Sequence, residues 1–143
     1  MSSSLVDDTD RLILKHLIQD ASLSHKELGQ LVHMTGQAVG IRVRRLEDLG
    51  ILEGRTLRWN AEKLGLSVHA FVTVFLRSPD GFSRIQAFLN EREEVEEAHR
   101  VSGEGCYWMR VRTADLAQLN ELLEPLTSFA TYKLTLSIGR VKG

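Results

Sequence analysis

The sequence has 143 residues, of which 43% are hydrophobic and 26% are charged, and its formal net charge is −1. These values are typical of a folded chain with one domain or two small ones, and they exclude a disordered, collagen-like or large two-domain enzyme architecture. The single cysteine cannot form an internal disulfide, no run of 18 apolar residues predicts a membrane span, and no signal peptide is visible at the N-terminus, so we expect a soluble cytoplasmic protein.

The first third of the chain predicts three short helices. Asp7 precedes the first helix, in which apolar residues recur at helical spacing. Ser24 and Glu27 match the Ser-x-x-Glu pattern of a capping box, which starts a second helix of about two turns. Thr35 is expected to cap a third helix that stops at Gly50. The inward stripe of this third helix comprises Val39, Val43, Leu46 and Leu49.

A longer, well-capped helix that follows a short helix and a short turn is typical of the helix-turn-helix motif. The outward side of the third helix carries Gln37, Arg42, Arg44 and Arg45. Residues 35–46 contain three basic residues and no acid, so this stretch is positive in an otherwise neutral chain. Arginine contacts phosphates or guanine edges, and glutamine pairs with adenine. The pattern favours a DNA-binding face over the alternative, a merely solvated helix surface.

Residues 51–59 are expected to form either a short β-excursion or a plain surface turn. Arg55 and Arg58 would give such an excursion a basic edge suited to DNA phosphates. Residues 60–67 are predicted to be a linker. The expected organisation is therefore a DNA-binding domain over residues 1–59 and a second domain over residues 68–143.

The second domain alternates between strands and helices. Strands are predicted over 68–76, 95–101, 106–112 and 132–138. One helix is expected to start after Ser78-Pro79-Asp80, and another is expected to be capped by Thr113. The order β-α-β-β-α-β is that of the ferredoxin-like fold, so the chain as a whole is predicted to be α+β.

The first of these strands is apolar on both of its faces. In a ferredoxin-like fold both helices cover one side of the sheet and leave the other side bare. Aromatic and apolar residues on that bare side would form an exposed patch that monomers seldom tolerate. We therefore expect a symmetric homodimer. The predicted interface residues are Phe71, Phe75 and Trp108, together with Cys106.

Catalytic and metal-binding roles find little support in the sequence. Cys106 and His99 lie near a glycine loop, but a lone cysteine at the start of a strand is usually a small buried apolar group. The five histidines show no metal-ligand spacing. The Gly103-Glu104-Gly105 segment leads into a strand and not into a helix, unlike a phosphate loop. We expect no enzyme activity, no metal and no cofactor.

Five segments, in this order along the chain, form a specific set. They are Asp7-x-x-Asp10-x-x-Ile13-Leu14, Leu23-Ser24-x-x-Glu27-Leu28, Arg42-Val43-Arg44-Arg45-Leu46-Glu47-x-Leu49-Gly50-Ile51, Lys63-Leu64-Gly65 and Val101-Ser102-Gly103-x-x-x-Tyr107. Through them the chain resembles, from about Val6 to the last strand, the Lrp/AsnC (leucine-responsive/asparagine, or feast/famine) family of regulators. The resemblance implies an N-terminal winged helix-turn-helix and a C-terminal βαββαβ domain that binds an amino acid. It also implies dimers that join through their C-terminal sheets, often assembled into octamers, and sequence-selective repression or activation on double-stranded DNA.

The family resemblance also implies roles for individual positions. It places Gln37, Arg42, Arg44 and Arg45 at DNA-contacting positions of the third helix, with Thr35 at its start. It places the effector site at the loop Ser102, Gly103, Glu104, Cys106 and Tyr107.

The chain departs from the family pattern at three positions. Gly36 and Gly40 stand where many members have proline and a larger residue, and the glycines would either admit the DNA backbone or loosen the helix. Cys106 stands where many members have aspartate, which removes an acceptor for a ligand's ammonium group. The sequence therefore leaves open whether the effector is an amino acid, another ligand or absent.

A second class of function is also compatible with the residues. In that alternative, the chain is a small-molecule-binding metabolic module whose N-terminal helices mediate protein contacts. Ionic strength separates the two hypotheses, because binding to phosphates weakens steeply as salt is raised.

Overall fold

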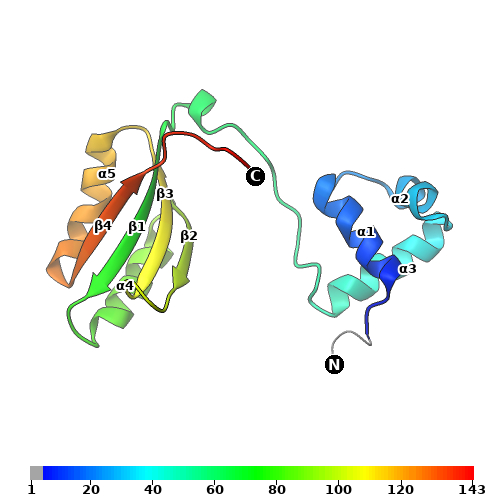
Figure 1. The fold of residues 1–143 in the computed structure, drawn as a ribbon, viewed down its shortest axis with the longest axis horizontal. Coiled ribbons are helices and arrows are strands. Elements are labelled where there is room, and N and C mark those ends of the chain that lie inside the picture. The colour runs from blue at the N-terminus through cyan, green and yellow to red at the C-terminus, as the bar shows by residue number, and fades with distance from the viewer. Residues whose placement is uncertain (1–4) are drawn as a thin grey trace. The chain divides into compact units, whose positions relative to one another are not determined.

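The computed structural model describes residues 5–143, which form two compact units, one ending at Arg58 and the other spanning Trp59–Gly143 (Figure 1). Each unit has its own hydrophobic core. Residues 1–4 lie outside the described residues. They belong to the predicted DNA-binding domain and to the N-terminus in which no signal peptide was found.

The first unit contains three helices, α1 (Asp8–Gln19), α2 (His25–Val32) and α3 (Gly36–Asp48). α1 and α2 both begin with a reciprocal capping box, as two side chain–backbone bonds at each start show. The Glu27 N–H donates to Ser24 Oγ over 3.0 Å, which confirms the predicted start of α2. Because α2 has only 8 residues, its stability depends on this cap and on packing. The core that holds the three helices together consists of Ile13, Leu17, Leu28, Val39 and Val43.

α3 stops where the sequence predicts, but the segment that follows it contains no β-strand. Gly50 adopts a left-handed φ of 73°, and the Ile51 N–H donates to the Leu46 carbonyl over 3.0 Å. A left-handed glycine of this kind ends many helices. Residues 51–59 form no strand, so the β-excursion is absent and the alternative, an irregular surface segment, is observed. The first unit is a helix-turn-helix without a paired wing among the residues that the structure describes.

The second unit is a four-stranded antiparallel sheet with two helices. Its elements are β1 (Val68–Leu76), α4 (Gly81–Glu91), β2 (Val95–Arg100), β3 (Tyr107–Thr113), α5 (Leu116–Leu123) and β4 (Ala130–Leu136), with short 3-10 helices at Glu62–Leu64 and Glu124–Ser128. The strand order is β2-β3-β1-β4. This order and the β-α-β-β-α-β sequence of elements confirm the α+β, ferredoxin-like prediction.

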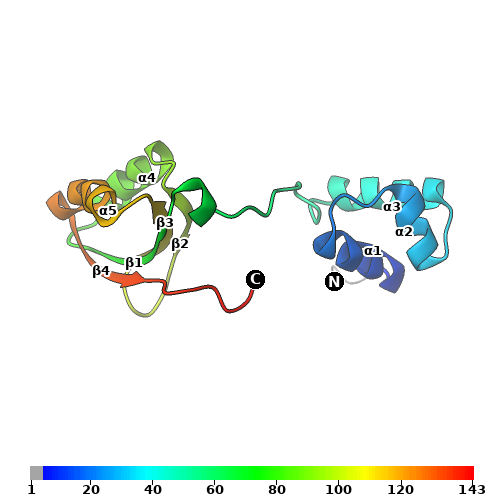
Figure 2. The same ribbon diagram turned by 90° about the horizontal axis from the view of Figure 1, so that it is seen from above.

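α4 and α5 cover the same face of the sheet (Figure 2). The core between them and the sheet includes Val72, Val74, Ile85, Met109 and Leu122, none of which is more than 2% exposed. Along β1 these core residues alternate with residues on the opposite face, as the pleat of a strand requires.

Several predicted boundaries in this unit are shifted by one or two residues. The N-cap of α5 is Asp115, whose side chain accepts the Gln118 N–H over 2.8 Å, whereas Thr113 is the last residue of β3. Thr113 is fully buried, and its hydroxyl donates to the Asp115 carbonyl, so it cannot serve as the cap. β4 begins two residues before the predicted strand and ends at Leu136.

The uncovered face of the sheet carries an aromatic row. The register places Thr73 of β1 opposite Trp108, so Phe71, Phe75 and Trp108 all point away from the helices, as predicted. The Phe71 and Trp108 rings stack with centroids 5.8 Å apart. Each of the three aromatic side chains is half-buried. Cys106 precedes β3 instead of starting it, and its N–H donates to the Val74 carbonyl over 2.8 Å.

Candidate nucleic-acid interface

The turn between α2 and α3 is held by backbone geometry that few residues tolerate. His33 ends α2 in the left-handed region with φ 58°, and the Met34 N–H donates to the Gly29 carbonyl over 2.8 Å. A Cβ atom at Gly29 would lie 2.4 Å from the Met34 carbonyl oxygen, so only glycine permits this close approach. Thr35 then caps α3, with its hydroxyl accepting the Ala38 N–H over 3.1 Å. These contacts fix α3 firmly against α2.

α3 has one buried face and one outward face. Val39, Val43 and Leu46 are at most 2% exposed, and Val39 and Val43 belong to the core shared with α1 and α2. Leu49, the fourth residue of the predicted inward stripe, lies beyond the helix end and is 40% exposed. At 100° per residue, the side directly opposite the buried stripe carries Gln37, Ile41 and Arg44, and all three are exposed.

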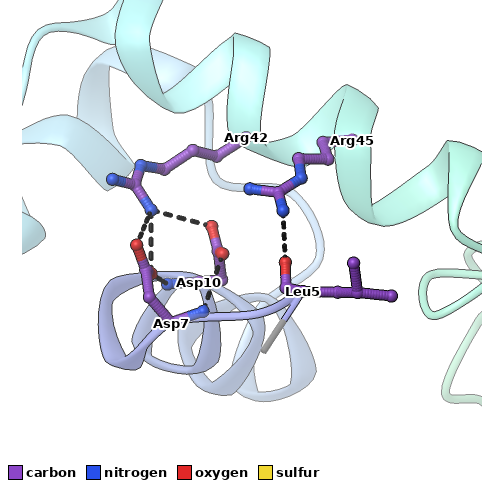
Figure 3. Close-up of polar contacts among 5 residues, drawn as sticks. All are labelled: Leu5, Asp7, Asp10, Arg42 and Arg45. Atoms are coloured by element: carbon purple, nitrogen blue, oxygen red, sulfur yellow. Dashed lines mark hydrogen bonds and ion pairs between the residues drawn. The ribbon is translucent and has the colours of Figure 1, made fainter. Parts of the chain in front are cut away.

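Arg42 does not project into solvent as the sequence suggested, because two aspartates hold its guanidinium group. Arg42 Nη1 donates to both carboxylate oxygens of Asp7 over 2.8 Å and to Asp10 Oδ1 over 3.0 Å (Figure 3). Asp10 is only 2% exposed, and a buried carboxylate needs such a partner. The expectation that Arg42 stands clear of the protein is therefore wrong. We call these three residues the Arg42 cluster.

The Arg42 cluster also explains an unusual acidity at the start of α1. The hydrogen bond from Arg42 is the largest of the causes that lower the pKa of Asp7 to about 2, and the backbone N–H of Asp10 contributes next. The carboxylate of Asp7 therefore serves two groups at once, the N-terminus of α1 and the side chain of α3. This arrangement joins the helix that precedes the motif to the helix that carries its basic residues.

The other two arginines of α3 differ from each other. Arg45 Nη2 donates to the Leu5 carbonyl, so it too is turned toward the N-terminal segment (Figure 3). Arg45 remains exposed, as expected for the outward side of the helix, although its guanidinium group is engaged by that backbone carbonyl. Within residues 5–143, Arg44 forms no hydrogen bond or ion pair. Arg44 is thus the arginine of α3 that the described residues leave available to an external partner.

The structure decides what the two unusual glycines of α3 do. A Cβ atom at Gly40 would lie 2.9 Å from the imidazole Nδ1 of His25, and one at Gly36 would lie 3.3 Å from the backbone of Lys26. Both glycines therefore make room for α2 inside the first unit. Neither the opening of space for a DNA backbone nor a loosened helix is needed to account for them.

Arg55 and Arg58 lie in the irregular segment after α3, and both are exposed. Neither forms a hydrogen bond or ion pair with the part of the chain that the structure describes. Without strand pairing in this segment, nothing in the first unit orders them into the predicted basic edge.

The predicted effector residues are not all on one side of the sheet. Ser102, Gly103 and Glu104 are exposed in the loop between β2 and β3, and Glu104 pairs with Lys133 of β4 over 3.1 Å. Tyr107 pairs in register with Val74 on the helix-covered face, where its ring lies 6.0 Å from that of Phe82. Lys133, the partner of Glu104, is in register with Thr73 on the uncovered face, so this ion pair and the tyrosine ring lie on opposite faces of the sheet.

The described residues contain no cluster of three or more potential metal-ligating His, Cys, Asp or Glu side chains. Across residues 5–143, no helix is both long and apolar enough to cross a bilayer.

Comparisons with known proteins match both units. Residues 6–47 match the AsnC-type helix-turn-helix domain, and residues 69–142 match the Lrp/AsnC ligand binding domain. The chain is 39% identical to the HTH-type transcriptional regulator LrpB of Bacillus subtilis over 137 residues, covering 96% of this chain and 91% of that protein. It resembles the structure of B. subtilis LrpC with a TM-score of 0.90 at 26% identity, covering 96% and 97% of the two chains. A feast or famine regulatory protein from M. tuberculosis, solved in complex with L-methionine, has a TM-score of 0.89 at 31% identity, with 96% and 95% covered.

Proposed function

The chain belongs to the Lrp/AsnC family of transcriptional regulators, and we propose that it acts by inserting α3 into the major groove of double-stranded DNA. The observation that carries this proposal is the outward face of α3. Gln37 and Arg44 stand there opposite the buried stripe, and neither is engaged by another side chain among the described residues. The groove of B-DNA admits one α-helix and presents acceptors and donors that these side chains match.

In this proposal the three arginines of α3 have different tasks. Arg44 contacts DNA directly, at a phosphate or a guanine edge. Arg42 orients α3 by binding Asp7 and Asp10, which belong to α1 and its cap. Arg45, which is exposed and has a single backbone acceptor, can exchange that acceptor for a phosphate when DNA is bound. Thr35 acts at the start of the helix, where its cap orients the first-turn N–H groups.

In this proposal, self-association through the uncovered sheet face brings a second copy of α3 to the DNA. The aromatic row of Phe71, Phe75 and Trp108 is flanked by ion pairs, such as that between Arg110 and Glu97 at 3.2 Å. A row of stacked rings with a polar rim is typical of a protein interface. A homodimer formed in this way would carry two copies of α3, and further assembly to an octamer would carry more.

An amino-acid effector is the ligand class that we propose for the loop at Ser102–Glu104. The M. tuberculosis relative was solved with L-methionine. In this chain Glu104 supplies a carboxylate in the same loop in which Cys106 takes the place of the family's aspartate, and a ligand's ammonium group would compete with Lys133 for it. Calorimetric titration with the common amino acids tests this. Heat that is lost in Glu104→Gln supports the site, and the absence of heat with every amino acid removes it.

The test of DNA binding is fluorescence anisotropy with labelled duplexes selected from a random-sequence library by the wild-type protein. We expect affinity to fall steeply as salt rises, since each neutralised phosphate releases counterions. Arg44→Ala should weaken binding and make it less sensitive to salt. The matched control is Arg11→Ala, which removes an exposed arginine from α1 and should leave affinity unchanged. Failure to bind any duplex at low salt would overturn the proposal.

A further inference from the structure

One exposed side chain in the middle of α3 is apolar. Ile41 is 66% exposed and belongs to neither hydrophobic core. It lies four residues after Gln37 and three before Arg44, so the three side chains form one row on the helix surface. An exposed isoleucine alone is ordinary on a protein surface. Ile41 is notable because it lies in one row with Gln37 and Arg44, two polar side chains that have no side-chain partner among the described residues.

The chemistry of the major groove supplies a partner for an aliphatic side chain. Thymine is the base that presents a methyl group there, whereas the other base edges present hydrogen-bonding groups. Isoleucine offers no donor or acceptor, so it would strip water from a polar edge without replacing it. When the isoleucine side chain contacts a methyl group, apolar surface on both groups is removed from water, which favours binding. Gln37, in the same row, matches the donor and acceptor pattern of adenine.

We infer that Ile41 is a specificity-determining residue that contacts the C5-methyl group of a thymine in the bound site. The inference rests on the proposed insertion of α3 into the groove. The charge of the helix also supports DNA as the partner of this row. Residues 35–46 carry no acid, so the row faces a polyanion without a repelling carboxylate until Glu47 and Asp48 in the last turn.

Helix geometry predicts where this thymine lies. Four residues of an α-helix advance by about 6 Å, which corresponds to roughly two base-pair steps. The thymine contacted by Ile41 should therefore lie within about two steps of an adenine contacted by Gln37. This spacing distinguishes a direct contact from a general preference for A·T-rich DNA, which would show no fixed offset.

The experiment uses the full-length protein and the duplex that the wild-type protein selects from a random library. Each thymine is replaced in turn by deoxyuridine, which lacks only the C5-methyl group, and Kd is measured by anisotropy. One replacement should weaken wild-type binding about fourfold, the affinity equivalent of burying one methyl-sized group. In Ile41→Ala the same replacement should have no effect. Alanine is the better helix former, so this variant should fold.

Ile18→Ala is the matched control, because Ile18 is 76% exposed but lies on α1. It should retain wild-type affinity and the full effect of deoxyuridine. The inference is overturned if wild-type binding is indifferent to every replacement, or if Ile41→Ala keeps the same sensitivity. It is also overturned if Ile41→Ala loses self-association in light scattering while its base preference is intact, since Ile41 would then face another copy. Loss of all duplex binding by the wild type would instead defeat the proposed function.

Discussion

The structure predicts that Arg42→Ala acts mainly on folding and only indirectly on DNA. The substitution removes the guanidinium group that lies 3.0 Å from Asp10, whose carboxylate is only 2% exposed. Leaving a buried acceptor without its partner costs about 1–3 kcal/mol. Because the Arg42 side chain is itself 28% exposed, solvent will reach part of the site, and we expect a loss of about 2 kcal/mol in the free energy of unfolding.

Urea unfolding followed by far-UV circular dichroism measures this loss, and Arg44→Ala provides the comparison. Arg44 has no partner within the described residues, so its removal should change the free energy of unfolding by less than about 0.5 kcal/mol. At temperatures where both variants are folded, Arg44→Ala should weaken DNA binding more than Arg42→Ala does. The two arginines are only two positions apart in the sequence, which makes the contrast a stringent one.

Asp7→Asn separates the two possible roles of Arg42 still more clearly. If Arg42 contacts DNA, freeing it from Asp7 and removing a negative charge near the groove should strengthen binding. If the Arg42 cluster positions α3, the same change should weaken binding or leave it unchanged while lowering stability. Our reasoning fails if Asp7→Asn tightens DNA binding and Arg42→Ala unfolds at the same urea concentration as the wild type.

Four further predictions follow from individual contacts. Since the pKa of Asp7 is lowered from 3.8 to about 2, its stabilising effect should persist above pH 4 and disappear as the pH falls toward 2. Acid titration should show a smaller limb in Arg42→Ala than in the wild type, because that variant keeps only the hydrogen bond from the Asp10 N–H. Gly29→Ala should destabilise the first unit, because its Cβ would meet a backbone oxygen at 2.4 Å. Gly40→Ala should be neutral or stabilising by up to about 1 kcal/mol in the same urea assay, because the His25 ring that it meets is exposed and can rotate away. Phe71→Glu should yield a monomer in light scattering, whereas Leu64→Glu, at an exposed position in a short 3-10 helix, should not.

Much of the fold could be predicted because its determinants are local. The capping pair of Ser24 and Glu27 lies within four residues, and Gly50 marks the end of α3 by a preference that requires no tertiary contact. The β-branched and aromatic content of β1 gave the bounds of that strand without error. By contrast, Thr113 and Asp115 are both good caps by composition, and only the burial of Thr113 at the end of β3 decides between them.

The candidate site was less predictable because its decisive contacts span long separations. Arg42 and Asp7 are 35 positions apart, and both residue types are usually exposed, so no pattern in the sequence joins them. The same holds for the imidazole of His25 against Gly40. Ile41, in contrast, could have been found, because it lies opposite the predicted stripe of Val39 and Val43 once the helix is assigned. Only the charged and polar residues of this helix were considered as candidates from the sequence, and Ile41 was therefore not identified.

Because the three arginines of α3 make different contacts, the expected free energy of DNA binding is smaller than their number suggests. A count of three positive charges in residues 35–46 overstates what reaches the groove, because Asp7 and Asp10 neutralise Arg42 and the Leu5 carbonyl engages Arg45. One copy of α3 then makes few phosphate contacts, and sequence-independent binding by a single first unit should be weak. Two consequences follow from this physical limit. In the proposed function, useful affinity would come from two or more copies of α3 on one site, brought together through the uncovered sheet face of the second unit. In the same proposal, discrimination between sites would rest on the row formed by Gln37, Ile41 and Arg44, through hydrogen bonding, contact with a methyl group and charge.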